Sequence, residues 1–173
     1  LGSEKNNDIS TDLTELSRNI MFVISSGAKS ILDLEKTYEK LETYGIPRIS
    51  YNSNYMPGFW YEETNFFVDK NFESIDEIAN YLKLISNLKH QSSVLIFNKV
   101  PKNKSIDKTL IEKWIIESVK KAEIEKIKGK DLTPFLIAEI NNLSNNKTLE
   151  ANSALIINNA LVAGKIAKKF SSI

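Results

Sequence analysis

The chain has 173 residues, of which 42% are hydrophobic, and its 23 Lys and Arg residues nearly balance its 22 Asp and Glu residues. This is enough apolar material for one domain with a hydrophobic core, and the net charge of +1 gives no indication of a nucleic-acid or anionic-membrane partner. The absence of cysteine and the single His90 exclude disulfide bonds, thiolate chemistry and a histidine cluster for a metal. No apolar run approaches the ~20 residues needed to cross a bilayer, so we expect a soluble, cytoplasmic protein.

The first half of the chain predicts strands that alternate with helices. Residues 20–25, an apolar run rich in β-branched and aromatic side chains, are typical of a buried strand. Asp33 is expected to cap a helix over residues 34–44 that ends at Gly45, because such residues are common at helix boundaries. Residues 48–51 predict a second strand.

Helices predominate in the second half. Residues 74–77 form a capping box, so a helix is expected from there to about Leu88. Residues 93–98 predict a third buried strand. An amphipathic helix is predicted over residues 107–128, and Gly129 is expected to end it.

Two further helices complete the chain. Thr133 and Pro134 predict a cap and a first-turn proline, and residues 149–170 predict the last helix. Strands separated by helices indicate an α/β fold, a layered sheet with flanking helices. Three strands are few for a complete sheet, so we expect the remaining strands of a larger α/β fold to come from another chain or from sequence not present here.

Lys29 is the first candidate for chemistry. It belongs to residues 27–33 (GAKSILD), which follow the first predicted strand. Ligands of α/β folds bind beyond the carboxyl ends of strands, and a lysine that is partly desolvated there can attack a carbonyl as a free amine. The alternative is a solvated charge at the entry of a helix. The spacing of a Walker phosphate loop is absent.

Two carboxylates near the start form a second candidate. Asp8 and Asp12 are four residues apart, so on a helix they would lie on one face and could share a metal ion or a proton. The alternative, which the pattern by itself favours, is that Asp8 or Ser10 caps a helix and Asp12 lies in its first turn.

Two other segments allow either a functional or a structural role. Asn152, Ile156 and Asn159 have helical spacing, so their amides could enter an apolar face either as ligand contacts or as structural hydrogen-bond partners. Residues 56–60 (MPGFW) and the aromatic residues after them could form a stacking platform for a base, although such runs more often belong to the core.

Several segments follow one another in an order and spacing that resemble a known family. They are residues 8–13 (DISTDL), 27–34 (GAKSILDL), 40–43 (KLET), 45–47 (GIP), 57–59 (PGF), Asn98 with Pro101, 129–130 (GK), 133–136 (TPFL), 149–152 (LEAN) and 158–160 (NNA). The family is that of the pseudouridine-5'-phosphate glycosidases, also described as pseudouridylate synthases or indigoidine synthase A-like proteins. The resemblance covers essentially the whole chain.

The resemblance implies an enzyme that reversibly cleaves the C–C glycosidic bond of pseudouridine 5'-phosphate, with water, to give uracil and ribose 5-phosphate. It implies that Lys29 forms a covalent Schiff-base intermediate with C1 of the sugar. It also implies that Mn²⁺ or another divalent cation assists, with Asp8 as a metal ligand.

Further site residues are implied by the same resemblance. Ser10, Thr11 and Asp12 are expected to contact the substrate, and Asn152 is expected to lie in the sugar pocket. The acid that protonates uracil C5 and a phosphate-side lysine belong to the N-terminal half of the family.

The resemblance also implies that residues 1–173 are the C-terminal half of a single catalytic domain. The expected partners are the small-molecule substrate and products, the N-terminal half, and further copies in a homotrimer, with no nucleic acid and no membrane. A rival interpretation is a non-catalytic domain that binds a nucleotide or a partner chain. Another is an interaction module built on the helix predicted over residues 107–128.

Overall fold

The computed structural model describes residues 11–31 and 33–173. They contain a parallel sheet in the order β1-β4-β2-β3, formed by β1 (Phe22–Ser25), β2 (Arg48–Tyr51), β3 (Lys70–Phe72) and β4 (Val94–Phe97). The α-helices are α1 (Thr11–Arg18), α2 (Leu34–Thr43), α3 (Ile75–Asn87), α4 (Lys108–Ile124), α5 (Leu132–Leu143) and α6 (Lys147–Phe170). Short 3-10 turns are η2 (Lys102–Lys104) and η3 (Gly129–Asp131). The predicted α/β class, a layered sheet with flanking helices, is confirmed.

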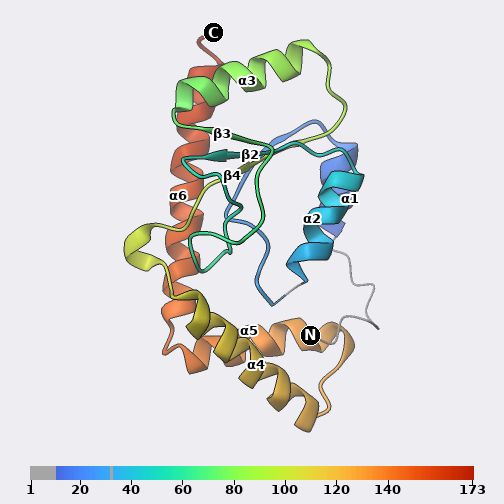
Figure 1. Cartoon of the computed structure of the whole chain (residues 1–173), viewed down its shortest axis with the longest axis vertical. Coiled ribbons are helices and arrows are strands. Elements are labelled where there is room, and N and C mark those ends of the chain that lie inside the picture. Colours follow the sequence, from blue (N-terminus) through green and yellow to red (C-terminus); the bar gives the residue numbers. More distant parts are fainter. Residues whose placement is uncertain (1–10, 32) are drawn as a thin grey trace.

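Helices cover the sheet on both sides (Figure 1). α1 and α2 lie on one side, and α3 and α6 lie on the other, where α6 runs along the length of the molecule. α4 and α5 lie beyond the sheet, beside the end of α6 that is remote from α3. The parallel pairing places the carboxyl ends of all four strands at one edge of the sheet.

β4 forms the centre of the core. Leu95 and Phe97 pack in a cluster with residues of α1 and α2, whereas Val94 and Ile96 pack in a cluster with residues of α3 and α6. Successive side chains of a strand point to opposite faces, so a strand with four apolar residues is buried on both sides of the sheet. This arrangement explains why residues 93–98 have no polar alternation.

A further cluster fills the space between α4, α5 and α6. Its buried members include Ile111 of α4, Ile140 of α5 and Leu155 of α6. Trp60 and Tyr61, from the segment after β2, pack into the same cluster. The aromatic residues that follow β2 therefore connect the sheet to the α4–α5 pair.

All three predicted strands are present; residues 48–51 match β2, whereas β4 (Val94–Phe97) is one residue shorter at each end than predicted. The first strand begins at Phe22, and Ile20 is 62% exposed instead of buried. β3 was not predicted, because its three residues (KNF) include a charged and an amide side chain and form no apolar run. It pairs with β2 at the edge of the sheet, where such residues are tolerated.

Two predicted helix boundaries were wrong. α5 begins at Leu132, so Thr133 lies inside its first turn and is not its cap. Pro134 is still accommodated there, because the first turn of a helix leaves its N–H groups without intrahelical partners. α4 ends at Ile124, and Lys126 adopts a left-handed conformation (φ 57°), which terminates the helix before Gly129.

The expected caps of α2 and α3 are confirmed. Asp33 accepts a hydrogen bond from the Lys36 N–H, and Ser74 accepts one from the Glu77 N–H. The Glu77 carboxylate accepts from the Ser74 N–H in return, which completes the capping box. Among the described residues, no helix is both long and apolar enough to span a bilayer.

We expect Ser74→Ala to lower the free energy of unfolding by about 1 kcal/mol, because the Glu77 N–H loses its side-chain acceptor. Urea denaturation of the intact protein measures this change. Ser86→Ala is the matched control, since Ser86 is an exposed residue in the last turn of the same helix. Equal effects of the two substitutions would contradict the capping role.

Candidate active site

Lys29 lies in the loop that joins β1 to α2, at the carboxyl edge of the sheet. Its side chain is partly buried. Ser26, the first residue after β1, is only 2% exposed, so the loop starts from a backbone fixed inside the protein. The predicted location of Lys29, directly beyond the carboxyl end of the first strand, is confirmed, although β1 is only partly buried.

Gly27 allows this loop to approach the segment after β2 closely. Its φ angle is +88°, a conformation that side chains disfavour, and a Cβ atom at this position would lie 2.1 Å from the Pro57 carbonyl oxygen. Both observations require glycine. Gly27 therefore brings the backbone of the lysine loop into contact with Pro57.

Hydrogen bonds hold the same two segments together. The Phe59 N–H donates to the Ser26 carbonyl oxygen (2.9 Å), and the Ser30 hydroxyl donates to the Gly58 carbonyl oxygen (2.8 Å). These bonds flank Lys29 on both sides along the chain. Residues 26–30 and 57–59, which are separate motifs in the sequence, therefore form one unit in the structure.

Two tyrosines support this unit from inside the core. Tyr38 of α2 donates a long hydrogen bond to the Pro57 carbonyl oxygen (3.5 Å), and burial raises its pKa well above the ordinary value. Burial also raises the pKa of Tyr61, and a hydrogen bond with Ser30 opposes part of that increase. Both hydroxyls therefore stay protonated at neutral pH and act as hydrogen-bonding groups.

The amides of α6 reach the same region from the other side of the sheet. Asn159 hydrogen-bonds Ser26 and Asn98, at the carboxyl ends of β1 and β4. Ile156 was expected on the same buried face, but it is 57% exposed, so that part of the prediction was wrong. Asn159 supports the structural alternative, since its partners are protein groups.

Asn152 lies seven residues before Asn159 on α6 and is partly buried. Seven residues are about two helical turns, so the two amides share a face and lie roughly 10 Å apart along the axis.

Asp12 is exposed in the first turn of α1, as the first-turn alternative predicts. Lys29, Asp12 and Asn152 thus belong to three separate elements.

The remaining predicted site residues lie outside what the structure describes. Asp8 and Ser10 precede the described residues, and the backbone of Thr11 begins α1 while its side chain is not described. Within residues 11–31 and 33–173, no group of three His, Cys, Asp or Glu residues could hold a metal ion. The assignments of Asp8 to a metal and of Ser10 and Thr11 to substrate therefore stay predictions.

Met56 and Trp60 of the predicted stacking platform belong to the core, whereas Phe59 is partly buried and Phe67, in the aromatic stretch that follows, is 67% exposed. Met56 is 1% exposed and Trp60 is 3% exposed, so neither ring nor thioether offers a surface to a base. Of the residues around Lys29, Ser26 was missed by sequence reasoning. A small polar residue directly after a buried apolar strand is the signal that could have identified it.

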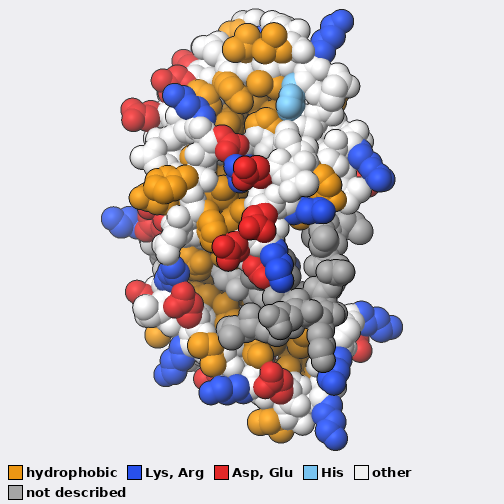
Figure 2. Space-filling model, turned by 45° about the vertical axis from the view of Figure 1, so that its right-hand side comes forward, with side chains coloured by type: hydrophobic (Ala, Val, Ile, Leu, Met, Phe, Trp, Pro, Cys, Tyr) orange, Lys and Arg blue, Asp and Glu red, His pale blue; other side chains and the backbone are white. Residues whose placement is uncertain are grey.

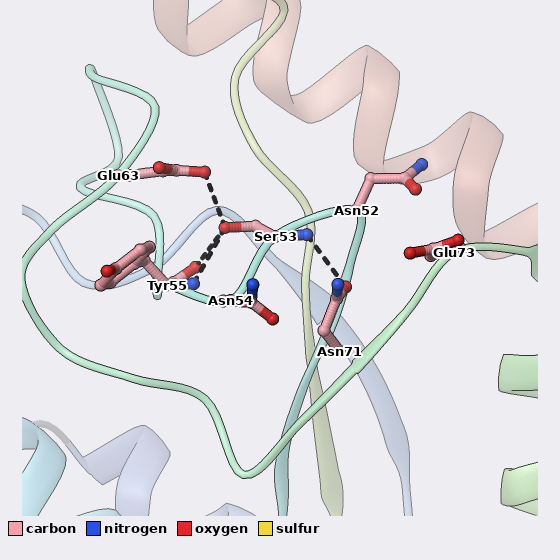
Figure 3. A pocket seen from close by; sticks show the side chains of 7 residues that line it. All are labelled: Asn52, Ser53, Asn54, Tyr55, Glu63, Asn71 and Glu73. Carbon is pink, nitrogen blue, oxygen red and sulfur yellow. Dashed lines mark hydrogen bonds between the residues drawn. The ribbon is translucent and has the colours of Figure 1, made fainter.

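A polar hollow of about 340 Å³ lies at the carboxyl ends of β2 and β3 (Figure 3). It is lined by Asn52, Ser53, Asn54, Tyr55, Glu63, Asn71 and Glu73. The Ser53 hydroxyl donates to Glu63 (2.8 Å), and the Ser53 N–H donates to Asn71 (3.0 Å). Of the predicted site residues that the structure describes, neither Lys29 nor Asp12 nor Asn152 lines this hollow.

Glu63 in this hollow is an ionised carboxylate at neutral pH. The Ser53 hydrogen bond, together with Lys99, lowers the pKa of its carboxyl group, although partial burial opposes the effect. Lys99 Nζ lies 3.0 Å from Glu63 Oε1. Glu63 is therefore a poor proton donor, and its charge is compensated within the protein.

Comparison with known proteins identifies a family and several relatives of this chain. The family model described as "Indigoidine synthase A like protein" matches residues 1–169. A pseudouridine-5'-phosphate glycosidase of Petrotoga mobilis is 43% identical over 164 residues, which are 95% of this chain and 54% of that protein. One of Brachyspira hyodysenteriae is 41% identical over 166 residues, 96% of this chain and 54% of that protein. The chain spans about half the length of these relatives.

Two solved structures share the fold. The prealnumycin C-glycosynthase AlnA, in complex with ribulose 5-phosphate, aligns with a TM-score of 0.91 and 28% identity, over 98% of this chain and 56% of that one. An indigoidine synthase A-like protein of Thermotoga maritima aligns with a TM-score of 0.82 and 32% identity, over 93% of this chain and 53% of that one. With a family match that extends over nearly all of its length, the chain belongs to the indigoidine synthase A-like family.

Proposed function

We propose that this chain is part of an enzyme that cleaves the C–C glycosidic bond of pseudouridine 5'-phosphate to give uracil and ribose 5-phosphate. The observation that carries the proposal is the position of Lys29, in a glycine loop held at the carboxyl edge of a parallel sheet. Relatives at 41–43% identity are named pseudouridine-5'-phosphate glycosidases, and AlnA was solved with a phosphorylated sugar.

Lys29 is the proposed nucleophile. A C–C glycosidic bond has no heteroatom leaving group, so protonation of a leaving group contributes little. The Lys29 amine can bond to sugar C1 as the C1–O4 bond of the ribose ring breaks, and O4 keeps that electron pair and takes up the proton that the amine loses. The bond between sugar C1 and uracil C5 can then break, with its electron pair passing to uracil C5. C1 is left as the iminium of Lys29, uracil C5 takes up a proton, and water hydrolyses the iminium to release ribose 5-phosphate and the free amine.

The arrangement around Lys29 suits a covalent step. Nucleophilic addition requires the reacting atoms to be held about 3 Å apart, and a displacement of 1 Å can cost on the order of 100-fold in rate. Hydrogen bonds from Phe59 and Ser30 fix the backbone on either side of Lys29. We propose that Asp12 and Asn152 complete the substrate contacts from α1 and α6, together with Ser10 and Thr11.

The proton for uracil C5 is proposed to come from residues outside 1–173. Tyr38 and Tyr61 are held protonated by burial and hydrogen-bond protein groups, and Glu63 is held ionised. General acids work best with a pKa near the operating pH, which none of these three has. We therefore assign the general acid and the phosphate-side lysine to the other half of the relatives' length.

Exposed apolar surface on residues 1–173 supports the proposal that a second half of the enzyme packs against them. β1 is an edge strand whose residues are all only partly buried, although parallel sheets are normally covered on both faces and at both edges. Leu149, Ile156 and Leu161 of α6 are each more than half exposed. Hydrophobic side chains also reach the surface over much of the face shown in Figure 2. We propose that the N-terminal half of the enzyme covers part of this surface and that the complete enzyme is a homotrimer.

A divalent cation, Mn²⁺ or a similar ion, is proposed as cofactor, with Asp8 as a ligand. Oxygen ligands suit such hard cations, and when bound, the ion would offset negative charge on the substrate. Asp8 lies outside the described residues, and Asp12, which is exposed in the first turn of α1, is assigned to the substrate and not to the ion.

Borohydride reduction in the presence of ribose 5-phosphate tests the nucleophile. In the full-length enzyme, we expect an adduct on Lys29, located by peptide mass spectrometry. Lys29→Arg keeps the charge but cannot form the iminium, so turnover should fall on the order of 1,000-fold or more. The control is Lys36→Arg. Lys36 is the next lysine along the sequence and is exposed, so this substitution should leave turnover and adduct formation unchanged. An active preparation that yields no adduct would rule out the Schiff-base role of Lys29 and would favour a different catalytic mechanism.

Paired carboxylate variants test the metal assignment. Asp8→Asn should raise the Mn²⁺ concentration needed for half-maximal activity by roughly 10-fold or more, because a charged ligand is lost. Asp12→Asn should instead raise the substrate KM and leave the metal requirement unchanged. Metal titrations of both variants against the wild type distinguish these roles. If the Asp8→Asn titration overlays that of the wild type, Asp8 acts only as a helix cap.

Residues 1–173 expressed alone should self-associate and show no turnover of pseudouridine 5'-phosphate, because the exposed apolar surface lacks its cover. Size-exclusion chromatography and a uracil-release assay measure both properties. Co-expression with the other half, as one chain or as a second polypeptide, should restore a defined assembly and activity. Turnover by the isolated 173 residues would place the acid within them.

A further inference from the structure

Three polar side chains close a ring beneath the lysine loop. The Ser26 hydroxyl donates to the Asn98 carbonyl oxygen (2.8 Å), and the Asn159 amide donates to the Ser26 hydroxyl (3.1 Å). The Asn98 amide then donates to Asn159 Oδ1 (2.9 Å). Ser26 is 2% exposed and Asn98 is 5% exposed, so these groups have little access to water and depend on one another for hydrogen bonds.

The ring fixes the point at which β1 becomes the lysine loop. On the backbone, the Asn98 N–H donates to the Ser25 carbonyl oxygen (2.8 Å), and the Phe59 N–H donates to the Ser26 carbonyl oxygen (2.9 Å). Ser26 is therefore held by β4, by the segment after β2 and, through Asn159, by α6. Among the hydrogen bonds of the described residues, those with Asn159 connect Ser26 to α6.

We infer that Asn159 is a positioning residue for Lys29, acting through the Ser26 hydroxyl. The inference rests on the proposed function, in which the Lys29 amine must reach C1 of the sugar. Lys29 is three residues from Ser26, and Gly27 between them gives the backbone little stiffness of its own. The direction in which the loop leaves the sheet therefore depends on how firmly Ser26 is held.

The same helix offers a matched control. Asn158, the neighbouring residue, donates its amide to the Lys99 carbonyl oxygen (3.2 Å), in the segment after β4. It therefore anchors α6 to the carboxyl edge of the sheet without a bond to Ser26. Replacement of either asparagine by alanine removes one partly buried amide from α6, but only the change at 159 affects the ring.

In the full-length enzyme, Asn159→Ala should lower kcat by about 10- to 100-fold and change the substrate KM by less than about threefold, because the nucleophile is misplaced while the substrate contacts remain. Asn158→Ala should leave kcat within about threefold of the wild type. Similar falls in melting temperature are expected for both. Equal kcat values in the two variants, or a change confined to KM, would overturn the inference.

Ser26→Ala removes only the linking hydroxyl, and it provides the same test if Asn159→Ala does not fold. It should reproduce the loss of kcat, and the double variant should be no worse than the more damaging single variant, since both substitutions break one connection. Losses that add in the double variant would show that Asn159 does not act through Ser26.

Hydrogen–deuterium exchange of a peptide spanning residues 26–31 gives a readout independent of activity. Exchange should be faster in Asn159→Ala and Ser26→Ala than in Asn158→Ala and the wild type. If the wild-type enzyme forms no adduct with ribose 5-phosphate, the proposed function fails, but this comparison still decides whether Asn159 holds the loop. If exchange in Asn159→Ala equals that of the wild type, Asn159 does not hold the lysine loop in place.

Discussion

A side chain at position 27 would meet the Pro57 carbonyl oxygen at 2.1 Å, so the lysine loop packs against the segment after β2 only because residue 27 is glycine. That contact brings the Phe59 N–H to the Ser26 carbonyl and the Ser30 hydroxyl to the Gly58 carbonyl. The loop thereby obtains hydrogen-bond partners that neither β1 nor α2 supplies. The position of Lys29 depends on this approach of two backbones more than on any contact of its own side chain.

The two edges of the sheet have different characters. β3 is three residues long and carries Lys70 and Asn71, features that discourage further pairing at an exposed edge. β1 is the opposite edge, and its residues Phe22, Val23 and Ile24 are apolar and partly buried. Further strands are therefore disfavoured at the β3 edge, whereas the β1 edge is suited to contacts with another apolar surface. β1 is also the strand that leads into the lysine loop. A partner that packs at β1 would therefore lie beside the candidate active site.

Local patterns predicted those features that depend on near neighbours in the sequence. The capping box at Ser74, the cap at Asp33 and the buried strand β4 each follow from a few adjacent residues. The place of Lys29 followed from one general rule, that sites lie beyond the carboxyl ends of strands.

What could not be predicted depends on distant parts of the chain. β3 exists because β2 offers it a partner, and its own three residues have no strand pattern. The buried apolar face of α6 was predicted to include Ile156, which is exposed, because helical spacing alone does not fix which side of a helix meets the sheet. The ring of Ser26, Asn98 and Asn159 joins residues that are up to 133 positions apart, so no local motif encodes it.

This separation also sets an order in which the region can assemble during synthesis. Asn98 is synthesised 72 residues after Ser26, and Asn159 is synthesised 133 residues after it. At translation rates of about 5–20 residues per second, the ring closes roughly 7 to 27 seconds after Ser26 is made. Until β4 is made, just before Asn98, β1 has neither β4 nor α6 beside it, and α6 is still incomplete when Asn159 is made. Apolar segments without their neighbours make a nascent chain prone to aggregate or to bind a chaperone. Among the contacts of the described residues, those that hold the lysine loop therefore form late, after a stage of synthesis in which β1 lacks its neighbours β4 and α6.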